Sequence, residues 1–318
     1  MKFGLSTLTR GLLTTREAYQ AIAKAAEGAG FDFLSVSDHV VVPATLKSAY
    51  PYAVGGVFGA AEHGHCLDQL ATIAFLAGST ERLRLLTSVL VVPHRPALLT
   101  AKLLATIDVL SNGRLIIGAG AGWMKEEFAL LNLPFEARGS VTDEYLEAFR
   151  ELWSKDRPVY SGKHVRFAEL LFYPKPLQRP HPPIWIGGES LAARKRAIKF
   201  ADAWYPGNNN QQRPLDTPTR LAAAVATLRA ECEQAGRDPG KLGISLLVQD
   251  PFQWSAQKTQ DGSGRRLFTG SSSEMIADAG ELAGIGVGHV AVRLGGQSIA
   301  DAVGRIERFG AEVIAKTT

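Results

Sequence analysis

Cysteine is scarce in this chain of 318 residues, and long apolar runs are missing. The two cysteines, Cys66 and Cys232, lie far apart in the sequence, so we expect free thiols rather than a disulfide framework. No apolar run approaches the roughly 18 residues that indicate a membrane-spanning helix. No basic and then apolar leader precedes the polar turn at residues 7–9. We therefore expect a cytoplasmic protein without a membrane partner.

Basic residues are in only small excess over acidic residues. The 35 Lys and Arg residues against 31 Asp and Glu residues give a net charge of +4, and the bases are scattered along the chain. This distribution is weak evidence for nucleic acid, which we do not expect as a partner, and is equally compatible with a mildly anionic small molecule. Apolar residues make up 46% of the chain, which is enough for a large core and excludes disorder for most of it.

Short apolar runs alternate with stretches of helical period, which predicts parallel strands joined by crossover helices. The predicted strands cover residues 2–6, 31–37, 84–91, 114–118, 184–187, 203–205, 243–249 and 289–294. The predicted helices cover residues 14–29, 67–78, 96–110, 140–153, 190–200, 218–235, 274–283 and 299–315. Eight strand-then-helix units favour a closed α/β barrel of the TIM type over an open doubly wound sheet. Without a linker or a solenoid repeat, we predict one domain over residues 1–318.

Three predicted connections are too long for simple turns: residues 39–65, 208–217 and 250–273. Connections of more than about 12 to 15 residues without regular structure are usually functional. In a barrel of this kind, the connections that follow strands form the face where active sites lie. We therefore expect the chemistry at the carboxyl ends of the strands.

The segment GAGAG at residues 118–122 follows a predicted strand. A dinucleotide fingerprint would need the spacing G-x-G-x-x-G before a helix, and this segment lacks that spacing. Glycine at alternate positions removes side chains from one face of the chain. Two interpretations remain open: close approach of a flat ring, or tight packing at a corner of the barrel.

A second glycine pair, at residues 187–188, comes before a predicted helix that begins at Ser190. Free N–H groups at a helix start beside a serine hydroxyl favour an anion such as phosphate. The alternative is an ordinary serine cap. Glu189 would repel the anion unless its side chain points away.

Asp38 and His39 follow the second predicted strand. A histidine titrates near neutral pH and suits proton transfer, or a hydrogen bond to a ring substituent that becomes negative. The alternative is that Asp38 caps the loop and His39 is structural. Further along, His63, His65 and Cys66 lack a fourth ligand with zinc-like spacing, so we predict no metal site.

Three segments together resemble the luciferase-like monooxygenase superfamily. They read RPALLTAKLLATIDVLSNGRLIIGAGAGWMKEEF (95–128), PFEARGSVTDEYLEAFRELW (134–153) and PKPLQRPHPPIWIGG (174–188). They are especially similar to the branch of oxidoreductases that depend on the deazaflavin coenzyme F-420. The resemblance implies a (β/α)8 barrel that binds F-420 or FMN at the carboxyl ends of the strands. We expect a small organic substrate as partner, and a homodimer.

The resemblance also implies roles for particular residues. Asp38 and His39 match an acid–histidine pair near the flavin ring, where the histidine is a candidate acid or base. Ser88 and Val89 match a non-proline cis peptide that backs the ring. The implied cofactor-binding residues are Ser88, Val89, Gly120, Ala121, Gly122 and Trp123 beside the ring, and Gly187, Gly188 and Ser190 at the phosphate. With this resemblance, the flat ring becomes the favoured interpretation of the alternating glycines.

The chain departs from the sugar-phosphate dehydrogenases of that branch at two positions. Ala121 stands where they carry a glutamate that donates a proton, and Pro43 stands where they carry a tryptophan. Their substrate and acid cannot be transferred to this chain. Glu126 or Glu127 could supply a carboxylate, but a solvated helix face is the favoured interpretation of both.

Several functions remain open at this point. The preferred one is hydride transfer between F-420 and a small organic substrate, and the runner-up is an FMN-dependent monooxygenase that uses molecular oxygen. A barrel that binds flavin without turnover is a third, and a lyase or isomerase that holds a substrate phosphate is a fourth. No predicted strand end offers the lysine of a Schiff-base aldolase. The long loops contain the aromatic residues Tyr50, Tyr52, Phe58, Phe252 and Trp254. These residues indicate a fairly apolar substrate.

Overall fold

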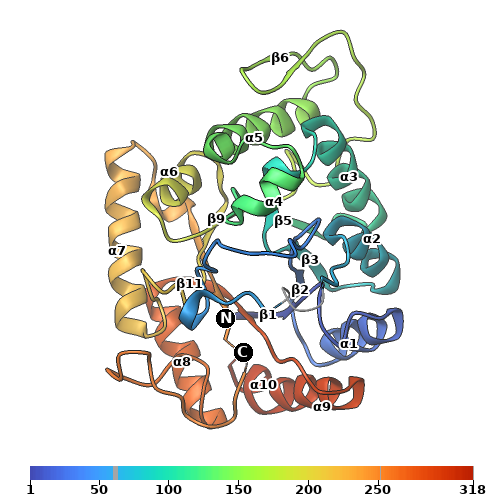
Figure 1. Ribbon diagram of the computed structural model, residues 1–318. Helices are drawn as coiled ribbons and strands as arrows, with labels where there is room; N and C mark the ends of the chain where they lie inside the picture. The colour runs from blue at the N-terminus through green and yellow to red at the C-terminus, as the bar shows by residue number, and fades with distance from the viewer. Residues whose placement is uncertain (60–63, 251, 318) are drawn as a thin grey trace.

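The computed structural model describes residues 1–59, 64–250 and 252–317. Eight parallel strands form a closed barrel, in the order β1, β2, β3, β5, β8, β9, β10 and β11, with β11 paired to β1 (Figure 1). Their bounds are β1 (Lys2–Thr7), β2 (Phe33–Val36), β3 (Arg84–Thr87), β5 (Leu115–Gly120), β8 (Ile184–Gly187), β9 (Ala203–Tyr205), β10 (Gly243–Val248) and β11 (Val287–Val292). The predicted barrel is confirmed.

Helices surround the barrel, as each strand is followed by a crossover (Figure 1). The main helices are α1 (Arg16–Gly28), α2 (Gln69–Ser79), α3 (Ala97–Leu110), α5 (Arg138–Ser154), α6 (Leu191–Phe200), α7 (Pro218–Gln234), α8 (Ser272–Ile285) and α9 (Ile299–Phe309). Most begin at a side-chain cap that satisfies an unpaired backbone N–H group. The capping residues are Thr15, Asp68, Ser190, Thr217, Ser271 and Ser298. No helix within the described residues is long and apolar enough to cross a membrane.

Some elements differ from the sequence prediction. The predicted strand 84–91 is divided into β3 and the short β4 (Leu90–Val91), and β5 continues two residues beyond the predicted end. The predicted last helix, 299–315, is α9 followed by a π turn at 310–314 and by α10 (Ala315–Thr317). The predicted helix and strand bounds do not include the short helix α4 (Lys125–Leu130), on which we expected only a helix face at Glu126 and Glu127, or the hairpin of β6 (Tyr160–Ser161) and β7 (Arg166–Phe167).

The core has two layers. Side chains between the strands and the helices form the larger layer, and a smaller cluster fills the barrel interior. Phe33 and Trp185 meet edge to face in this interior, with ring centroids 5.5 Å apart. Gly4 on β1 faces the Phe33 ring, and an added Cβ there would lie 2.1 Å from it. The Phe33 ring therefore occupies the space that a side chain at this position of β1 would need.

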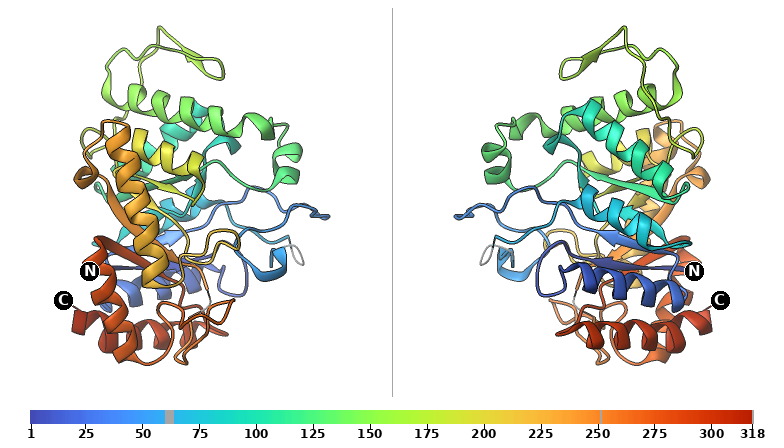
Figure 2. Two further views of the ribbon diagram at one scale, coloured as in Figure 1. Left: turned by 90° about the vertical axis from the view of Figure 1, so that its left-hand side faces the viewer. Right: turned by 90° about the vertical axis from the view of Figure 1, so that its right-hand side faces the viewer.

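The loops at the carboxyl ends of the strands project away from the two chain termini (Figure 2). The blue loop that follows β2 extends furthest on this side, next to the green helices that follow β5. This loop contains the one-turn helix η1 (Val54–Gly56). The long connections predicted to build the active-site face therefore lie together at one end of the barrel.

Candidate functional site

A platform lies at the barrel mouth between β3 and β4. The peptide bond between Ser88 and Val89 is cis, as the resemblance implied. The Val89 side chain fills the space above two glycines: a Cβ added to Gly120 or to Gly187 would lie 2.7 Å or 2.9 Å from it. The Ser88 hydroxyl lies 3.1 Å from the Tyr205 hydroxyl. Glycines on β5 and β8 thus allow a partly exposed valine to project at the mouth.

The alternating glycines of residues 118–122 have a packing role. A Cβ on Gly118 would lie 2.0 Å from the Thr87 carbonyl oxygen, and Gly120 faces Val89. Gly122 has φ +87°, and a Cβ there would approach Val91 and Phe128. Protein atoms occupy the space that a Cβ at these glycines would need, which supports the interpretation of tight packing at a corner of the barrel. Their contact with a cofactor stays a prediction, as does that of Ala121.

His39 is joined to a buried glutamate. Its Nδ1 lies 2.8 Å from Oε2 of Glu127, while Oε1 of the same carboxylate accepts a hydrogen bond from the Val40 N–H at 2.7 Å. Burial alone would raise the pKa of Glu127, but the hydrogen bond and charge of His39, together with His94, outweigh it and lower this pKa. The carboxylate is therefore charged at neutral pH and accepts the hydrogen bonds that hold His39 and Val40 in place.

The expectation that Glu127 lies on a solvated helix face is wrong, because its side chain is fully buried. Glu126, its neighbour, instead accepts hydrogen bonds from the backbone N–H groups of Lys47 and Ser48. Both glutamates of α4 therefore hold the loop that follows β2. A sequence signal exists: Met124 and Phe128, four residues apart, mark the buried face, and Glu127 lies three residues after Met124.

Aromatic rings surround the His39 imidazole. The ring centroids of Phe58 and Trp123 lie 4.8 Å and 6.4 Å from that of His39. Tyr50 completes this aromatic cluster, at 5.1 Å from Trp123 and 5.4 Å from Phe58. Tyr50 and Phe58 come from the loop after β2, and Trp123 comes from the end of β5. The loop thus brings apolar surface over the predicted site.

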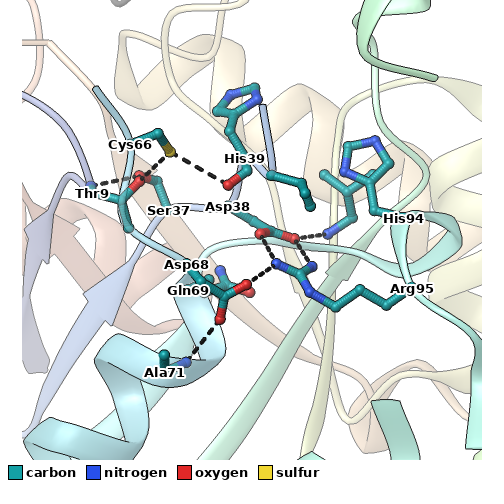
Figure 3. A network of polar contacts seen from close by, with 12 residues as sticks. Thr9, Ser37, Asp38, His39, Cys66, Asp68, Gln69, Ala71, His94 and Arg95 are labelled. Atoms are coloured by element: carbon teal, nitrogen blue, oxygen red, sulfur yellow. Dashed lines mark hydrogen bonds and ion pairs between the residues drawn. The ribbon is translucent and has the colours of Figure 1, made fainter. Parts of the chain in front are cut away.

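Asp38 is engaged in a buried ion pair (Figure 3). The Arg95 guanidinium donates to both of its carboxylate oxygens at 2.9 Å, and the Val91 N–H donates to one of them. Arg95 also pairs with Asp68, which caps α2. The carboxylate of Asp38 points toward Arg95 while the His39 ring points elsewhere (Figure 3). This geometry positions the strand ends around His39, and a catalytic role for Asp38 itself stays a prediction.

Near the second glycine pair, the structure shows an ordinary helix cap. The Ser190 Oγ accepts a hydrogen bond from the Ala193 N–H at 3.1 Å, and Gly188 has φ +99°. The two arginines that follow in α6 already form ion pairs: Arg194 with Glu231 at 2.7 Å and Arg196 with Asp143 at 2.5 Å. A cofactor phosphate at Gly187, Gly188 and Ser190 stays a prediction.

The side chain of Glu189 is buried rather than turned toward solvent. Its carboxyl oxygens accept hydrogen bonds from the Gly207 N–H at 2.6 Å, the Asn210 amide at 2.7 Å and the Tyr52 hydroxyl at 3.1 Å. Burial raises the pKa of Glu189 and outweighs these hydrogen bonds. No pattern in the sequence predicts this contact, which joins the loop after β2 to the start of α6.

A cavity of about 1590 Å³ opens beside this region, at the ends of β1, β10 and β11. Tyr50, Tyr52 and Phe252 line it, as expected for the substrate wall, whereas Phe58 is buried beneath the loop and Trp254 lies outside the lining. None of the predicted cofactor-binding residues lines the cavity. Tyr50 contacts both the cavity and the aromatic cluster around His39, and so lies between the two regions.

The structure offers no metal centre within the described residues. His63, which we considered as a ligand, lies outside those residues. Cys66 and Cys232 are both free, as expected. The Cys66 thiol lies 3.3 Å from the carbonyl oxygen of His39 and from the Thr9 hydroxyl (Figure 3).

Comparison with known proteins identifies the family. A family model described as luciferase-like monooxygenase matches residues 1–260. The chain belongs to this family. The proteins that it resembles include one named as FMNH(2)-dependent and one named as coenzyme F420 dependent. The chain thus belongs to a family of enzymes.

Two relatives are similar to this chain in sequence. The FMNH(2)-dependent dimethylsulfone monooxygenase of Pseudomonas putida is 33% identical over 207 residues, which cover 64% of this chain and 54% of the relative. The chain therefore spans about half the length of that relative. An uncharacterized protein of Mycobacterium bovis is 32% identical over 225 residues, which cover 70% of this chain and 77% of the relative.

Solved structures support the fold. Monooxygenase RslO1 of Streptomyces bottropensis matches with a TM-score of 0.76 and 19% identity, over the whole of both chains. The coenzyme F420 dependent tetrahydromethanopterin reductase of Methanopyrus kandleri matches with a TM-score of 0.74 and 19% identity, over 100% of this chain and 99% of that one. At this identity the likeness shows a shared luciferase-like barrel.

Proposed function

We propose that this enzyme oxidises or reduces a small organic substrate by hydride transfer to or from coenzyme F-420. The observation that carries the proposal is the pair of His39 and Glu127 at the mouth of a luciferase-like barrel. A histidine held by a buried carboxylate exchanges a proton in step with a two-electron change. The Asp38–His39 dipeptide, which matches the F-420 branch, supports this cofactor over FMN.

The residues at the mouth fit a flat ring system. Val89 offers an apolar surface supported from below by glycines, and the partly buried Trp123 lies beside His39. When bound, the deazaflavin accepts or donates the hydride. The protein supplies the apolar surface, excludes water with the loop after β2, and places His39 for the proton.

Within the chain, Glu127 determines which nitrogen of His39 takes part. Its carboxylate holds Nδ1 at 2.8 Å, so Nε2 is the nitrogen available for proton exchange. The charged Glu127 carboxylate also fixes the orientation of the His39 ring. Asp38 contributes indirectly, because its ion pair with Arg95 holds the end of β2, which His39 follows.

The phosphate of the cofactor is proposed to bind at Gly187, Gly188 and Ser190. The N-terminus of α6 favours negative charge, and Gly188 leaves the approach to it open. Glu189 is compatible with an anion there when its carboxyl group is neutral, which the raised pKa favours.

The proposal is tested by titrating the purified apoprotein with F-420 and, separately, with FMN, while following fluorescence. We expect F-420 to bind and FMN to bind at least 10-fold more weakly. Tight binding of FMN without a response to F-420 would overturn the proposed cofactor. The double variant Ser190→Ala and Gly188→Asp is expected to lose affinity, and unchanged affinity would refute the phosphate site.

A second candidate is an FMN-dependent monooxygenase that uses molecular oxygen. The 33% identity to an FMNH(2)-dependent monooxygenase favours it. Oxygen consumption that depends on both reduced FMN and substrate would identify this reaction. Binding of either cofactor without any change of its redox state by a panel of substrates would instead indicate a barrel without turnover.

A further inference from the structure

Two arginines in the large cavity have no acidic partner among the described residues. Arg10, after β1, and Arg293, after β11, both line the cavity and are partly buried. The cavity contains three other arginines, and each of these has an acid within ion-pair distance. The pairs are Arg220 with Asp216 at 2.6 Å, Arg266 with Asp250 at 3.1 Å, and Arg305 with Asp301 at 2.9 Å.

The two arginines line the cavity from neighbouring strands. They follow β1 and β11, which are adjacent strands with Leu5 opposite Val292. Burial lowers the pKa of Arg293, and the charge of Arg10 lowers it further, as expected for like charges that face the same space. The Tyr50 hydroxyl partly offsets burial at both arginines.

The surrounding groups do not neutralise this charge. The guanidinium carbon of Arg10 lies 4.5 Å from the centre of the Phe58 ring, a cation–π contact that supplies no counter-charge. The charge of Asp250 raises the pKa of Arg293. The Asp250 carboxylate already pairs with Arg266 and accepts hydrogen bonds from the side-chain amides of Asn208 and Asn209. Two like charges that are partly desolvated without a counterion are costly unless a ligand supplies one.

We propose that Arg10 and Arg293 bind the anionic group of the substrate, a carboxylate or sulfonate on a small organic molecule. Guanidinium groups recognise planar or tetrahedral oxyanions through paired hydrogen bonds. Tyr50 and Tyr52 line the cavity next to them and provide surface for an apolar body. That this anion belongs to a substrate rests on the proposed function, whereas the anion site itself does not.

Calorimetric titration of the apoprotein (residues 1–318) at low salt tests the site, with methanesulfonate and acetate as probes. Arg10→Met and Arg293→Met are each expected to weaken binding about 10-fold or more, because each removes a charge-assisted contact. Arg305→Met is the matched control, since Arg305 lines the same cavity but is paired with Asp301. Equal affinity in the wild type and both test variants, or no binding to the wild type, overturns the proposal.

A measurement on the wild-type protein covers the case in which a variant does not fold. Phenylglyoxal modifies accessible arginines, and peptide mapping reports each of them separately. Methanesulfonate is expected to protect Arg10 and Arg293 but not Arg305. Equal protection of all three arginines, or of none, contradicts the site.

The same variants distinguish a substrate anion from the phosphate of the cofactor. With Arg10 and Arg293 assigned to the substrate, the affinities of both variants for F-420 and FMN should stay within about twofold of the wild type. A parallel loss of cofactor affinity would instead assign the arginines to the cofactor and overturn the substrate assignment. If the wild type binds neither cofactor, the proposed function fails while the anion titration still reports on the arginines.

Discussion

At the scale of single residues, His39 takes its properties from a partner that is 88 residues away in the sequence. Replacing His39 by Asn keeps a hydrogen-bond donor for Glu127 but removes the titratable ring. We expect turnover to fall about 100-fold with little change in cofactor affinity, in line with the usual contribution of a general acid or base. Steady-state kinetics and fluorescence titration measure the two effects.

His181→Asn serves as the control for this substitution. His181 lies in the long connection between α5 and β8, and its Nδ1 lies 2.8 Å from the Pro182 carbonyl oxygen. Its loss should leave turnover unchanged. Unchanged turnover in the His39 variant would remove the proposed role of His39.

Glu127→Gln tests the partner. The pKa of Glu127 is lowered in the folded protein, so its charge stabilises the fold above the ordinary pKa, and this stabilisation is lost as the pH falls through the lowered value. At pH 7 we expect the variant to lose about 1–3 kcal/mol of unfolding free energy, the usual effect of disturbing a buried hydrogen bond to a charged group. Urea unfolding at pH 7 and pH 4 should show a smaller difference at the lower pH, and a difference that grows toward acid would contradict this account.

At the scale of elements, β1 and β2 approach closely because Gly4 has no side chain. Gly4→Ala would place a methyl group 2.1 Å from the Phe33 ring inside the barrel. We expect a loss of about 2–3 kcal/mol in unfolding free energy, typical of overpacking a core. Thermal and chemical unfolding provide the measurement.

Gly28→Ala is the matched substitution at the end of α1, where no atom lies within 4 Å of an added Cβ. It should be neutral, or stabilising by less than about 1 kcal/mol, because alanine favours a helix. Equal losses in the two variants would mean that the contact with Phe33 is not the cause.

The elements themselves were largely predictable, and their contacts were not. The strands 184–187 and 203–205 were predicted with their observed bounds, because β-branched and aromatic residues lie there between turn signals. The short β4 was missed because the Ser88–Val89 bond interrupts an apolar run that otherwise looks continuous. At the candidate site, His39 was singled out from its place at a strand end. The contact between Glu189 and Tyr52 was not predicted, because it depends on the course of a loop that has no periodicity.

At the scale of the whole molecule, His289 of β11 makes stability depend on pH. Burial lowers its pKa to about 4, and its ring lies between Phe33 and Trp185 in the barrel interior. Between pH 6.5 and about 4 the unfolded chain takes up a proton that the folded barrel does not. The unfolding free energy should therefore fall with the pH across this window, by at most about 1.4 kcal/mol per pH unit.

Urea unfolding of the wild type and of His289→Gln at several pH values between 7 and 4 checks this expectation. The variant should show a flatter dependence, since glutamine does not titrate. Parallel curves for the two proteins would assign the acid sensitivity to other groups.

Tyr50 belongs to one loop yet contacts both the aromatic cluster at His39 and the cavity that contains Arg10 and Arg293. We therefore expect a mutation in this loop to change the surroundings of the proposed cofactor site and of the proposed substrate site together. In evolution or in engineering, a new substrate range is more readily acquired through the connections after β10 and β11. These line the cavity without contributing to the rings around His39. Libraries that vary residues 252–261 and 293–297 should retain cofactor binding more often than libraries that vary residues 46–58.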